Sequence, residues 1–374
     1  MTSEDSWDIL IVGGGLAGLT AALHLSKAGV KVLLIEKQTY PQHKVCGEYV
    51  SNEVLPYVRS LGIDPMAVGA KQITQFEMST KKGALLQAKL PLGGFGISRY
   101  AFDHALYIAA SKQADFAFET VRSIAFSGDR FTVTTQSDRS YQAPFAIGAY
   151  GKRSTLDKTL VRSFIQQKSP WLGVKAHYQA DFPEDTVALH NFNGGYCGLS
   201  KTETGAVNAC YLTTYESFKR TENIVAFQQE VLSQNPNLKA FFQEAVPLFE
   251  KPLTISQISF QKKEPIVDHV FMLGDSAGLI HPLCGNGMAM AIHAAKLFSE
   301  LYLEAKQAGV IDRAQLENDY KKAWKSTFEN RLKSGRRIQS ALLHPVAATV
   351  GLGLVKTIPS ILPSIIKRTH GTLV

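Results

Sequence analysis

The sequence predicts a mixed α/β fold with a parallel-sheet domain, an inserted antiparallel-sheet domain and C-terminal helices. Two observations lead to this prediction. Residues 7–36 show the order strand, glycine turn, helix, strand, which is a βαβ unit built on parallel strands. Residues 171–215 and 253–262 instead alternate apolar and polar side chains, which is typical of an antiparallel sheet.

The N-terminal unit is defined by its apolar runs. We expect a strand at 7–12, a helix at 16–28 that stops at Gly29, and a buried strand at 30–35 that ends at Glu36. Farther along, an antiparallel meander is expected, with turns at Gly128-Asp129 and Ser137-Asp138. Its strands are 121–126, 130–135 and 140–141; further strands are expected at 145–150 and 269–273, and helices at 222–244, 287–305 and about 313–339.

The composition indicates what class of protein this is. The 374 residues are 45% hydrophobic and 19% charged, which indicates a folded protein with an ample core. The four cysteines are widely spaced and form no C-x-x-C pair, so neither a disulfide framework nor a zinc site is expected. No signal peptide or convincing membrane-spanning run is visible, and we expect a cytoplasmic protein.

The glycine turn carries the first functional motif. Gly13-Gly14-Gly15-Leu16-Ala17-Gly18 fits G-x-G-x-x-G, in which the first glycine permits a tight turn and the second lets the backbone approach a pyrophosphate. The third glycine allows close helix packing, and the helix N-terminus offers amide donors to an anion. Glu36 is placed to accept hydrogen bonds from ribose hydroxyls and to repel a 2′-phosphate. The unit therefore predicts dinucleotide binding.

A second motif lies some 240 residues later. An apolar strand delivers Gly274-Asp275-Ser276-Ala277-Gly278, and the loop from His281 to Met288, rich in proline and glycine, opens a helix. An aspartate at a strand end binds hydroxyl groups, and the start of a helix favours electron-rich or anionic groups. A dinucleotide that is held at both ends needs such an element.

Together these motifs resemble those of the FAD-dependent aromatic-hydroxylase and geranylgeranyl-reductase superfamily. Residues 43–48, His-Lys-Val-Cys-Gly-Glu, resemble the K-x-C-G segment of the reductase branch, and residues 99–103 resemble the R-x-x-[FL]-D segment of the superfamily. The resemblance covers about residues 7–300. It implies a Rossmann-type FAD-binding domain and a substrate domain; their expected bounds are 1–75 plus 97–165 plus 262–310, and 76–96 plus 166–261, with a helical region at 311–374.

The resemblance also implies residue roles. Glu36 binds the adenosine ribose, Asp275 the ribityl chain and Arg99 the pyrophosphate or ribityl, while 285–287 lie at the isoalloxazine, where the helix dipole stabilises the reduced flavin. Candidates near the ring, with no catalytic residue assigned, are Cys46, His281 and Pro282. The expected FAD contacts are Gly13, Gly15, Leu16, Ala17, Gly18, Glu36, Lys37, Lys44, Arg99, Val121, Gly274, Asp275, Gly285, Asn286, Gly287 and Met288.

Two departures from the superfamily patterns matter. Many hydroxylases have a D-G motif where this chain has Tyr150-Gly151, followed by Lys152 and Arg153, which could serve an anion or NAD(P)H. The W-x-W-x-I-P motif of flavin halogenases is absent, since the three tryptophans are far apart. That absence counts against halogenation.

Two flavin chemistries fit these motifs. We expect an NAD(P)H-driven monooxygenase that hydroxylates a bulky apolar or phenolic, polyketide-like substrate; the alternative is a reductase that saturates C=C bonds of a prenyl or lipid chain. The electron donor is NAD(P)H or a protein. A remote alternative is a serine hydrolase, because Gly274 to Gly278 also fits G-x-S-x-G around Ser276. A flavin-binding scaffold without catalysis is a further alternative.

The remaining candidates are local. Cys46 and Cys284 are expected to be inert, with a redox-active or substrate-facing role as the alternative. His43, Lys44 and Glu48 either handle protons, bind a substrate acid or form a solvated loop. The C-terminal part is basic without acidic residues from Arg331 onward, which suggests either peripheral membrane contact or a solvated helix face. The apolar stretch 341–366 is expected to lie on a membrane, to cover a lipophilic pocket, or to form ordinary core helices. No nucleic-acid partner is expected.

Overall fold

The computed structural model describes residues 6–221, 223–343 and 361–374. Its first sheet is built on the predicted βαβ unit, because β1 pairs in parallel with both β2 and β10. All strands but the edge strand β17 run parallel. In spatial order the six strands are β17 (Ile266–Val267), β18 (Val270–Met272), β10 (Phe145–Gly148), β1 (Ile9–Val12), β2 (Val32–Glu36) and β6 (Asp115–Phe118).

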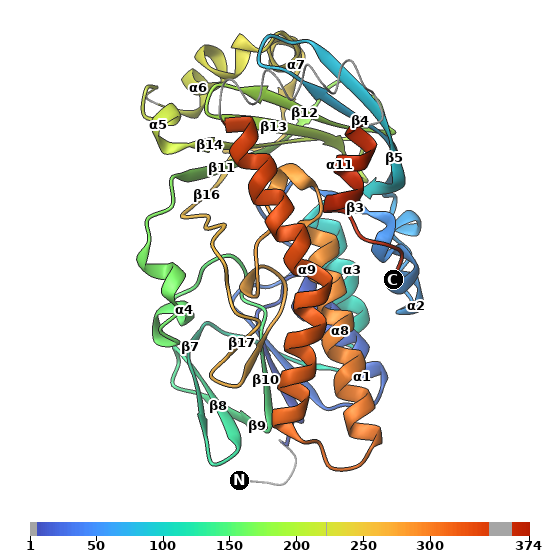
Figure 1. The fold of residues 1–374 in the computed structure, drawn as a ribbon, viewed down its shortest axis with the longest axis vertical. Coiled ribbons are helices and arrows are strands. Elements are labelled where there is room, and N and C mark those ends of the chain that lie inside the picture. The colour runs from blue at the N-terminus through green and yellow to red at the C-terminus, as the bar shows by residue number, and fades with distance from the viewer. Residues whose placement is uncertain (1–5, 222, 344–360) are drawn as a thin grey trace.

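Helices cover one face of this sheet, and a separate meander lies near its other face (Figure 1). The helix α1 packs against α3 and α8, and α9 packs along α8. The expected meander is confirmed, and left-handed Asp129 and Asp138 form its turns. The bounds are α1 (Leu16–Lys27), α3 (Arg99–Ala110), α8 (Gly287–Gln307), α9 (Arg313–Leu343), β7 (Val121–Ser127), β8 (Arg130–Thr135) and β9 (Ser140–Ala143).

The second sheet is mostly antiparallel and lies at the opposite end of the molecule (Figure 1). The alternating segments of the sequence form its centre, while the parallel pairing of β12 with β4 joins in a hairpin from an earlier part of the chain. Its nine strands are β15 (Val246–Pro247), β11 (Trp171–Gln179), β14 (Val207–Thr214), β13 (Gly195–Lys201), β12 (Thr186–Phe192), β4 (Lys71–Ser79), β5 (Leu85–Gly96), β3 (Tyr49–Ser51) and β16 (Leu253–Ser256).

The two faces of this second sheet have different environments. Alternate residues such as Leu172, Val174 and Ala176 face a core shared with α6 and α7, while Trp171, Leu189 and Leu212 face the first sheet, as the two-residue period of strands requires. The helix expected at 222–244 is divided, because Asn235 caps a new helix that begins with Pro236. The helices are α5 (Tyr215–Phe218), α6 (Ile224–Glu230) and α7 (Pro236–Glu244).

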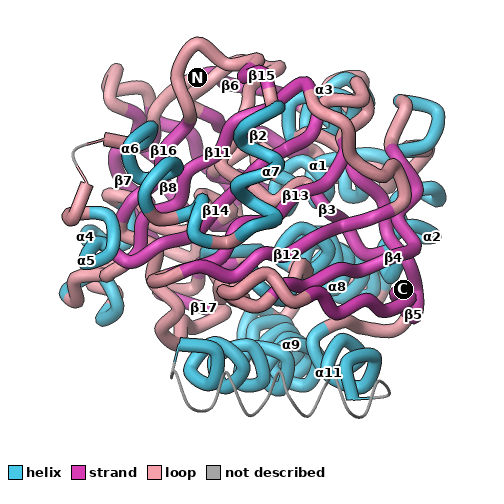
Figure 2. The backbone as a smooth tube through the Cα atoms, turned by 90° about the horizontal axis from the view of Figure 1, so that it is seen from above, coloured by secondary structure: helices cyan, strands magenta, loops and turns pink. Residues whose placement is uncertain are grey.

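The C-terminal helices lie along one flank. Figure 2 shows α9 and α11 (Ile361–Thr369) side by side, and the two helices are in contact. Most of the apolar stretch predicted at 341–366 lies outside the described residues. None of the described helices is at once long and apolar enough to cross a membrane. The described part of the chain also contains two short helices, α2 (Leu55–Ser60) and α4 (Leu156–Thr159).

Candidate active site

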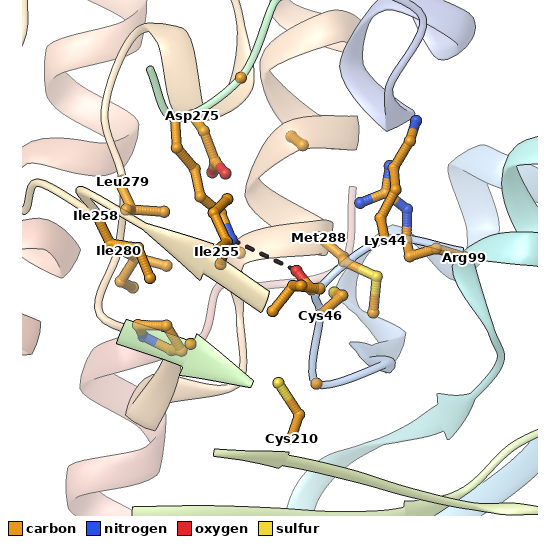
Figure 3. Close-up of a pocket in the computed structure, with 18 of the residues that line it drawn as sticks. Lys44, Cys46, Arg99, Cys210, Ile255, Ile258, Asp275, Leu279, Ile280 and Met288 are labelled. Atoms are coloured by element: carbon orange, nitrogen blue, oxygen red, sulfur yellow. Dashed lines mark hydrogen bonds between the residues drawn. The ribbon is translucent and has the colours of Figure 1, made fainter. Parts of the chain in front are cut away.

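One large cavity lies between the two sheets. Its volume is about 1030 Å³, and it extends from the glycine turn after β1 to the inner face of the second sheet. In Figure 3, Lys44 and Arg99 lie on one side of this cavity and Asp275, Leu279 and Ile280 on the other. Segments far apart in the sequence therefore meet at one space.

The glycine turn has the geometry that the motif predicts. Gly13 has a φ of +106°, and a Cβ there would lie 2.5 Å from the Ala149 carbonyl oxygen. A Cβ on Gly18 would lie 2.0 Å from the Gly13 oxygen, so this glycine permits the helix to pack on the turn. Gly15, Leu16 and Ala17 line the cavity, together with Gly13. The backbone is therefore open to a close ligand at the start of α1.

Glu36 lies at the end of β2, next to this turn. Its Oε2 accepts a hydrogen bond from the Gly14 amide at 2.6 Å, and its Oε1 accepts one from the Gln38 amide at 3.2 Å. Glu36 and Lys37 both line the cavity, in the place expected for a ribose contact. Val121 lies in the hydrophobic core at the start of β7, and is not among the residues that line the cavity.

Arg99 and Lys44 share one buried carboxylate, Asp103. Arg99 donates from Nε and Nη2 to the two Asp103 oxygens, each at 2.7 Å, and Lys44 Nζ lies 2.9 Å from Oδ2. Burial alone would raise the pKa of Asp103, but the charges of Arg99 and Lys44 hold it below its usual range. The predicted R-x-x-[FL]-D segment thus brings its arginine to the cavity, and Asp103 is the residue that orients it, four positions later on the same helix face.

A second buried carboxylate, Glu48, was not predicted to be structural. Its side chain is inaccessible and pairs with Lys175 and with His177 Nε2, the latter at 2.6 Å, and it accepts the Arg99 amide at 2.8 Å. Burial would raise the pKa of Glu48, but the hydrogen bond from His177 and the charge of Lys175 lower it. The interpretation of 43–48 as a solvated loop is therefore wrong for Glu48, because partners from β11 bury it.

Three strands of the second sheet, β11, β13 and β14, hold the loop that carries Cys46. Lys175 donates to the Lys44 carbonyl at 3.1 Å, Asn208 to the Cys46 carbonyl at 3.1 Å, and Ser200 to the Gly47 carbonyl at 3.3 Å. Single polar residues within apolar strands were the only sequence signal for these three contacts. The second sheet thus fixes the position of a loop that also contacts the glycine turn, where Lys44 Nζ donates to the Gly14 carbonyl at 3.4 Å.

The second motif reaches the cavity through its backbone and through Asp275. Gly274, Asp275, Gly285, Gly287 and Met288 all line it. Ser276 does not support a hydrolase: its hydroxyl is buried and bonded to the backbone of Gly151, accepting from the amide at 2.9 Å. A nucleophilic serine must instead be exposed beside a base.

Asn286 connects the start of α8 with the C-terminal segment. Its Nδ2 donates to the Thr369 carbonyl at 2.9 Å and to buried Glu53 at 3.3 Å, while its buried Oδ1 has no partner among the described residues. Glu53 also pairs with Arg331 of α9 at 2.9 Å and accepts the Gly371 amide. This network ties α8, α9 and the C-terminus together.

The three residues expected near the flavin ring do not all reach the cavity. Cys46 and Pro282 line the cavity, whereas His281 does not and lies among Trp171, Tyr196 and Phe260. Burial lowers the pKa of His281 to about 3, so this imidazole is neutral. All four cysteines are free thiols, and burial raises the pKa of Cys284 to about 12.

A large part of the remaining wall of the cavity is apolar. This part comes from five strands of the second sheet, from the loops after β16 and β18, and from α9 and α11. Two residues of the C-terminal apolar stretch, Ile365 and Ile366, therefore line this pocket. The apolar lining residues are Phe76, Met78, Leu90, Val187, Leu189, Leu212, Ile255, Ile258, Leu279, Ile280, Ile338, Ile365 and Ile366.

These features fit a flavin adenine dinucleotide. The turn at Gly13–Gly15 is open to a pyrophosphate, and a carboxylate lies at the end of β2. Asn286, whose buried Oδ1 has no partner among the described residues, lines the same space at the start of α8. Comparison with known families agrees, because the family described as "FAD binding domain" matches residues 6–317. The chain belongs to this FAD binding domain family. It is therefore an FAD-dependent oxidoreductase.

Relatives in this family have different names. A tryptophan 2-halogenase from Chondromyces crocatus is 24% identical over 353 residues, which cover 88% of this chain and 67% of the relative. A digeranylgeranylglycerophospholipid reductase from Methanosarcina mazei is 25% identical over 362 residues, covering 91% and 86%. The structure of the flavin-dependent brominase Bmp2 superposes with a TM-score of 0.78 at 16% identity, covering 97% and 93%. At that identity the superposition shows a shared fold.

Proposed function

We propose that this FAD-dependent oxidoreductase is an NAD(P)H-driven monooxygenase that hydroxylates a bulky apolar or phenolic substrate. One observation carries the proposal. The cavity that begins at the glycine turn, Gly13–Gly15, continues into the apolar space against the second sheet. The added apolar volume suits a substrate of considerable size.

The residues of the chain divide the work between binding and exclusion of water. Gly13–Ala17, Glu36, Arg99 and Asp275 would hold FAD, which when bound supplies hydride chemistry and oxygen activation. The first amides of α8, at Gly287 and Met288, would favour negative charge on the reduced ring through the helix dipole. Apolar side chains such as Leu189 and Ile255 exclude water from the reacting region.

The test uses the purified FAD-loaded protein. The enzyme is reduced anaerobically with NADPH or NADH, then mixed with air and a phenolic or polyketide-like substrate, and O₂ consumption, NAD(P)H consumption and product mass are measured. Substrate-stimulated consumption of both, with a product one oxygen heavier, is expected. Oxygen consumption that no substrate of this class stimulates, together with anaerobic alkene reduction, would contradict the proposal.

A reductase that saturates C=C bonds is the second candidate. The observation that favours it is the segment Lys44-Val45-Cys46-Gly47, which lies at the cavity and resembles the K-x-C-G of the reductase branch. The digeranylgeranylglycerophospholipid reductase match also spans most of the chain. Anaerobic incubation of the reduced enzyme with a polyprenyl lipid separates the two: two added hydrogens per double bond indicate the reductase.

Halogenation has less support from the residues of this chain. Several similar proteins are named as halogenases or brominases. This chain, however, lacks the paired-tryptophan motif of flavin halogenases. Chloride or bromide added to the oxygenation assay should therefore leave the product unhalogenated, as product mass will show.

A further inference from the structure

Three basic residues follow β10 and line the same cavity: Lys152, Arg153 and Lys158. Lys152 and Arg153 directly follow Tyr150-Gly151, which stands where many hydroxylases have a D-G motif. We propose that the three basic residues form a subsite for an anionic group, a carboxylate or phosphate, at one end of an otherwise apolar substrate. This inference rests on the proposed function, since it names the class of substrate: an amphipathic acid.

The first argument is that these cations lack anionic partners. Among the described residues, no carboxylate lies within ion-pair distance of any of the three. Arg153 Nη2 donates to the Ile165 carbonyl at 3.0 Å, but its Nη1 is enclosed and has no partner in the described structure. An enclosed guanidinium with a free N–H is costly unless an anion binds it.

The acids that line the cavity are committed elsewhere. Glu36 bonds the glycine turn, and Glu48 is neutralised by Lys175. Asp157, which is near these cations in sequence but is not among the lining residues, is paired with buried Arg162 at 3.0 Å. Asp275 lines the cavity and is the residue expected to bind the ribityl chain of FAD. Carboxylates of the protein itself therefore do not account for the charge at 152–158.

The local environment is also positive beneath these residues. Lys263 is buried and donates to the backbone oxygens of Lys152 and Asp275, at 2.7 and 2.8 Å. Burial, together with the charges of Arg162 and Lys152, lowers the pKa of Lys263 to about 8, against the opposing effect of Asp275. Burial is the largest cause of this shift, and the cations Arg162 and Lys152 add to it. Lys263 therefore adds a buried amine next to the three basic residues, held by backbone oxygens rather than by a carboxylate.

The subsite lies beside the apolar wall. Lys152 Nζ is 3.5 Å from the Val45 carbonyl, and Val45 lies across from Gly173, whose added Cβ would meet both Val45 and Ile255 at 3.4 Å or less. Ile255 and Ile258 continue the apolar lining from there. A ligand with a charged end and a long apolar body therefore matches the order of the lining residues.

The subsite differs from the part of the cavity expected to hold the FAD pyrophosphate. Beside the glycine turn the cations are Lys44 and Arg99, and Arg99 Nη2 lies 3.6 Å from the position of a Cβ on Gly15. Both of those cations are already paired with Asp103. Lys152 and Arg153 retain unshared donors, and arginine binds carboxylates and phosphates in a two-pronged geometry.

The experiment titrates the FAD-loaded enzyme with dodecanoate, dodecyl phosphate and the neutral dodecanol, and follows perturbation of the flavin absorbance spectrum. The wild type should bind the two anions about tenfold or more tightly than dodecanol. The double variant K152Q/R153Q should lose about that tenfold preference while keeping its affinity for dodecanol. K239Q, an exposed lysine of α7 outside the cavity, is the matched control and should behave as wild type.

The variant R153K tests whether a folding defect causes the loss. It retains the positive charge and should therefore keep most of the preference for the anions over dodecanol. Three outcomes would overturn the inference. Equal weakening for dodecanol would indicate a structural effect, loss of FAD content would assign the residues to the cofactor, and a raised KM for NADPH alone would assign them to the electron donor. Retained oxidoreductase activity with no anion preference defeats only this inference, whereas an enzyme that never takes up FAD defeats the proposed function itself.

Discussion

The two halves of the cavity are built in different ways. The half beside the first sheet consists of backbone turns and paired charges, such as Gly13, Glu36 and the Arg99–Asp103 pair. The half beside the second sheet consists of alternate apolar side chains from several strands, with Leu189 and Leu212 as examples. One half therefore depends on conformation and charge, and the other on shape.

This difference indicates which half of the cavity tolerates amino-acid substitutions. Backbone geometry and buried ion pairs fail when a single atom is added or a single charge removed. An apolar wall adjusts to substitution at a cost that grows with the area lost. The following predictions test this contrast in order of decreasing effect.

G13A should abolish FAD binding. The residue has a φ of +106°, and the new Cβ would lie 2.5 Å from the backbone oxygen of Ala149, so the turn or β10 must move. Flavin retained on purification, measured by visible absorbance, should fall to background. The matched control is G29A, at a φ of +77° with open space around the Cβ. It should keep its flavin and lose only about 1 kcal/mol of stability, and equal loss in both variants would contradict the argument from close approach.

E48Q should destabilise the protein by about 3–5 kcal/mol, the range for a buried pair that loses one partner. The substitution leaves the Lys175 ammonium, which is inaccessible to solvent, without a counter-charge. Urea unfolding followed by tryptophan fluorescence measures the change. E184Q, which removes an exposed partner of Lys71, should cost less than about 1 kcal/mol. A stable E48Q would show that the second sheet does not need this pair to hold the Cys46 loop.

Acid should weaken the same charged half. Asp103 and Glu48 both have a lowered pKa in the folded protein, so their contribution to stability is complete above the ordinary carboxyl value of about 4. It is lost as the pH falls from there through the lowered values. Urea titrations at a series of pH values should therefore show a steep fall in the free energy of unfolding below about pH 4, and a shallower one in D103N. An unchanged slope in D103N would exclude Asp103 as a source.

The sequence predicted these halves unequally, for the same physical reason. The half beside the first sheet could be predicted from short motifs that are continuous in the sequence, because one turn and one strand end supply Gly13, Gly15 and Glu36. Its supporting residues were missed: Lys175 and His177 lie about 130 positions from Glu48, and nothing local distinguishes them from other polar residues in a strand. The division of the helix at Asn235 had a local signal in its following proline, but helical apolar spacing on both sides outweighed it.

The apolar wall could be predicted only as an alternating pattern. That pattern places Leu189 on one face of its strand and leaves open which segment faces it. The face is decided by long-range pairing of β12 with β4, which are more than 100 residues apart. Covering a lipophilic pocket was one of three alternatives for the C-terminal apolar stretch, and α11 contributes Ile365 and Ile366 to the cavity; the apolar pattern alone could not choose among the three. Such contacts depend on the assembled fold.

L189A should have the smallest effect. Leu189 is buried on the cavity side of β12, and its truncation enlarges an existing space instead of opening a new one, so a stability loss of about 2 kcal/mol is expected. FAD content should be unchanged, while KM for an apolar substrate should rise about tenfold through lost contact. The control is L172A, a leucine on the opposite face of the sheet, which should cost at least as much stability and leave KM unaltered. If L172A changes KM as much as L189A does, the two faces are not functionally separate, and the apolar half of the cavity is not where the substrate binds.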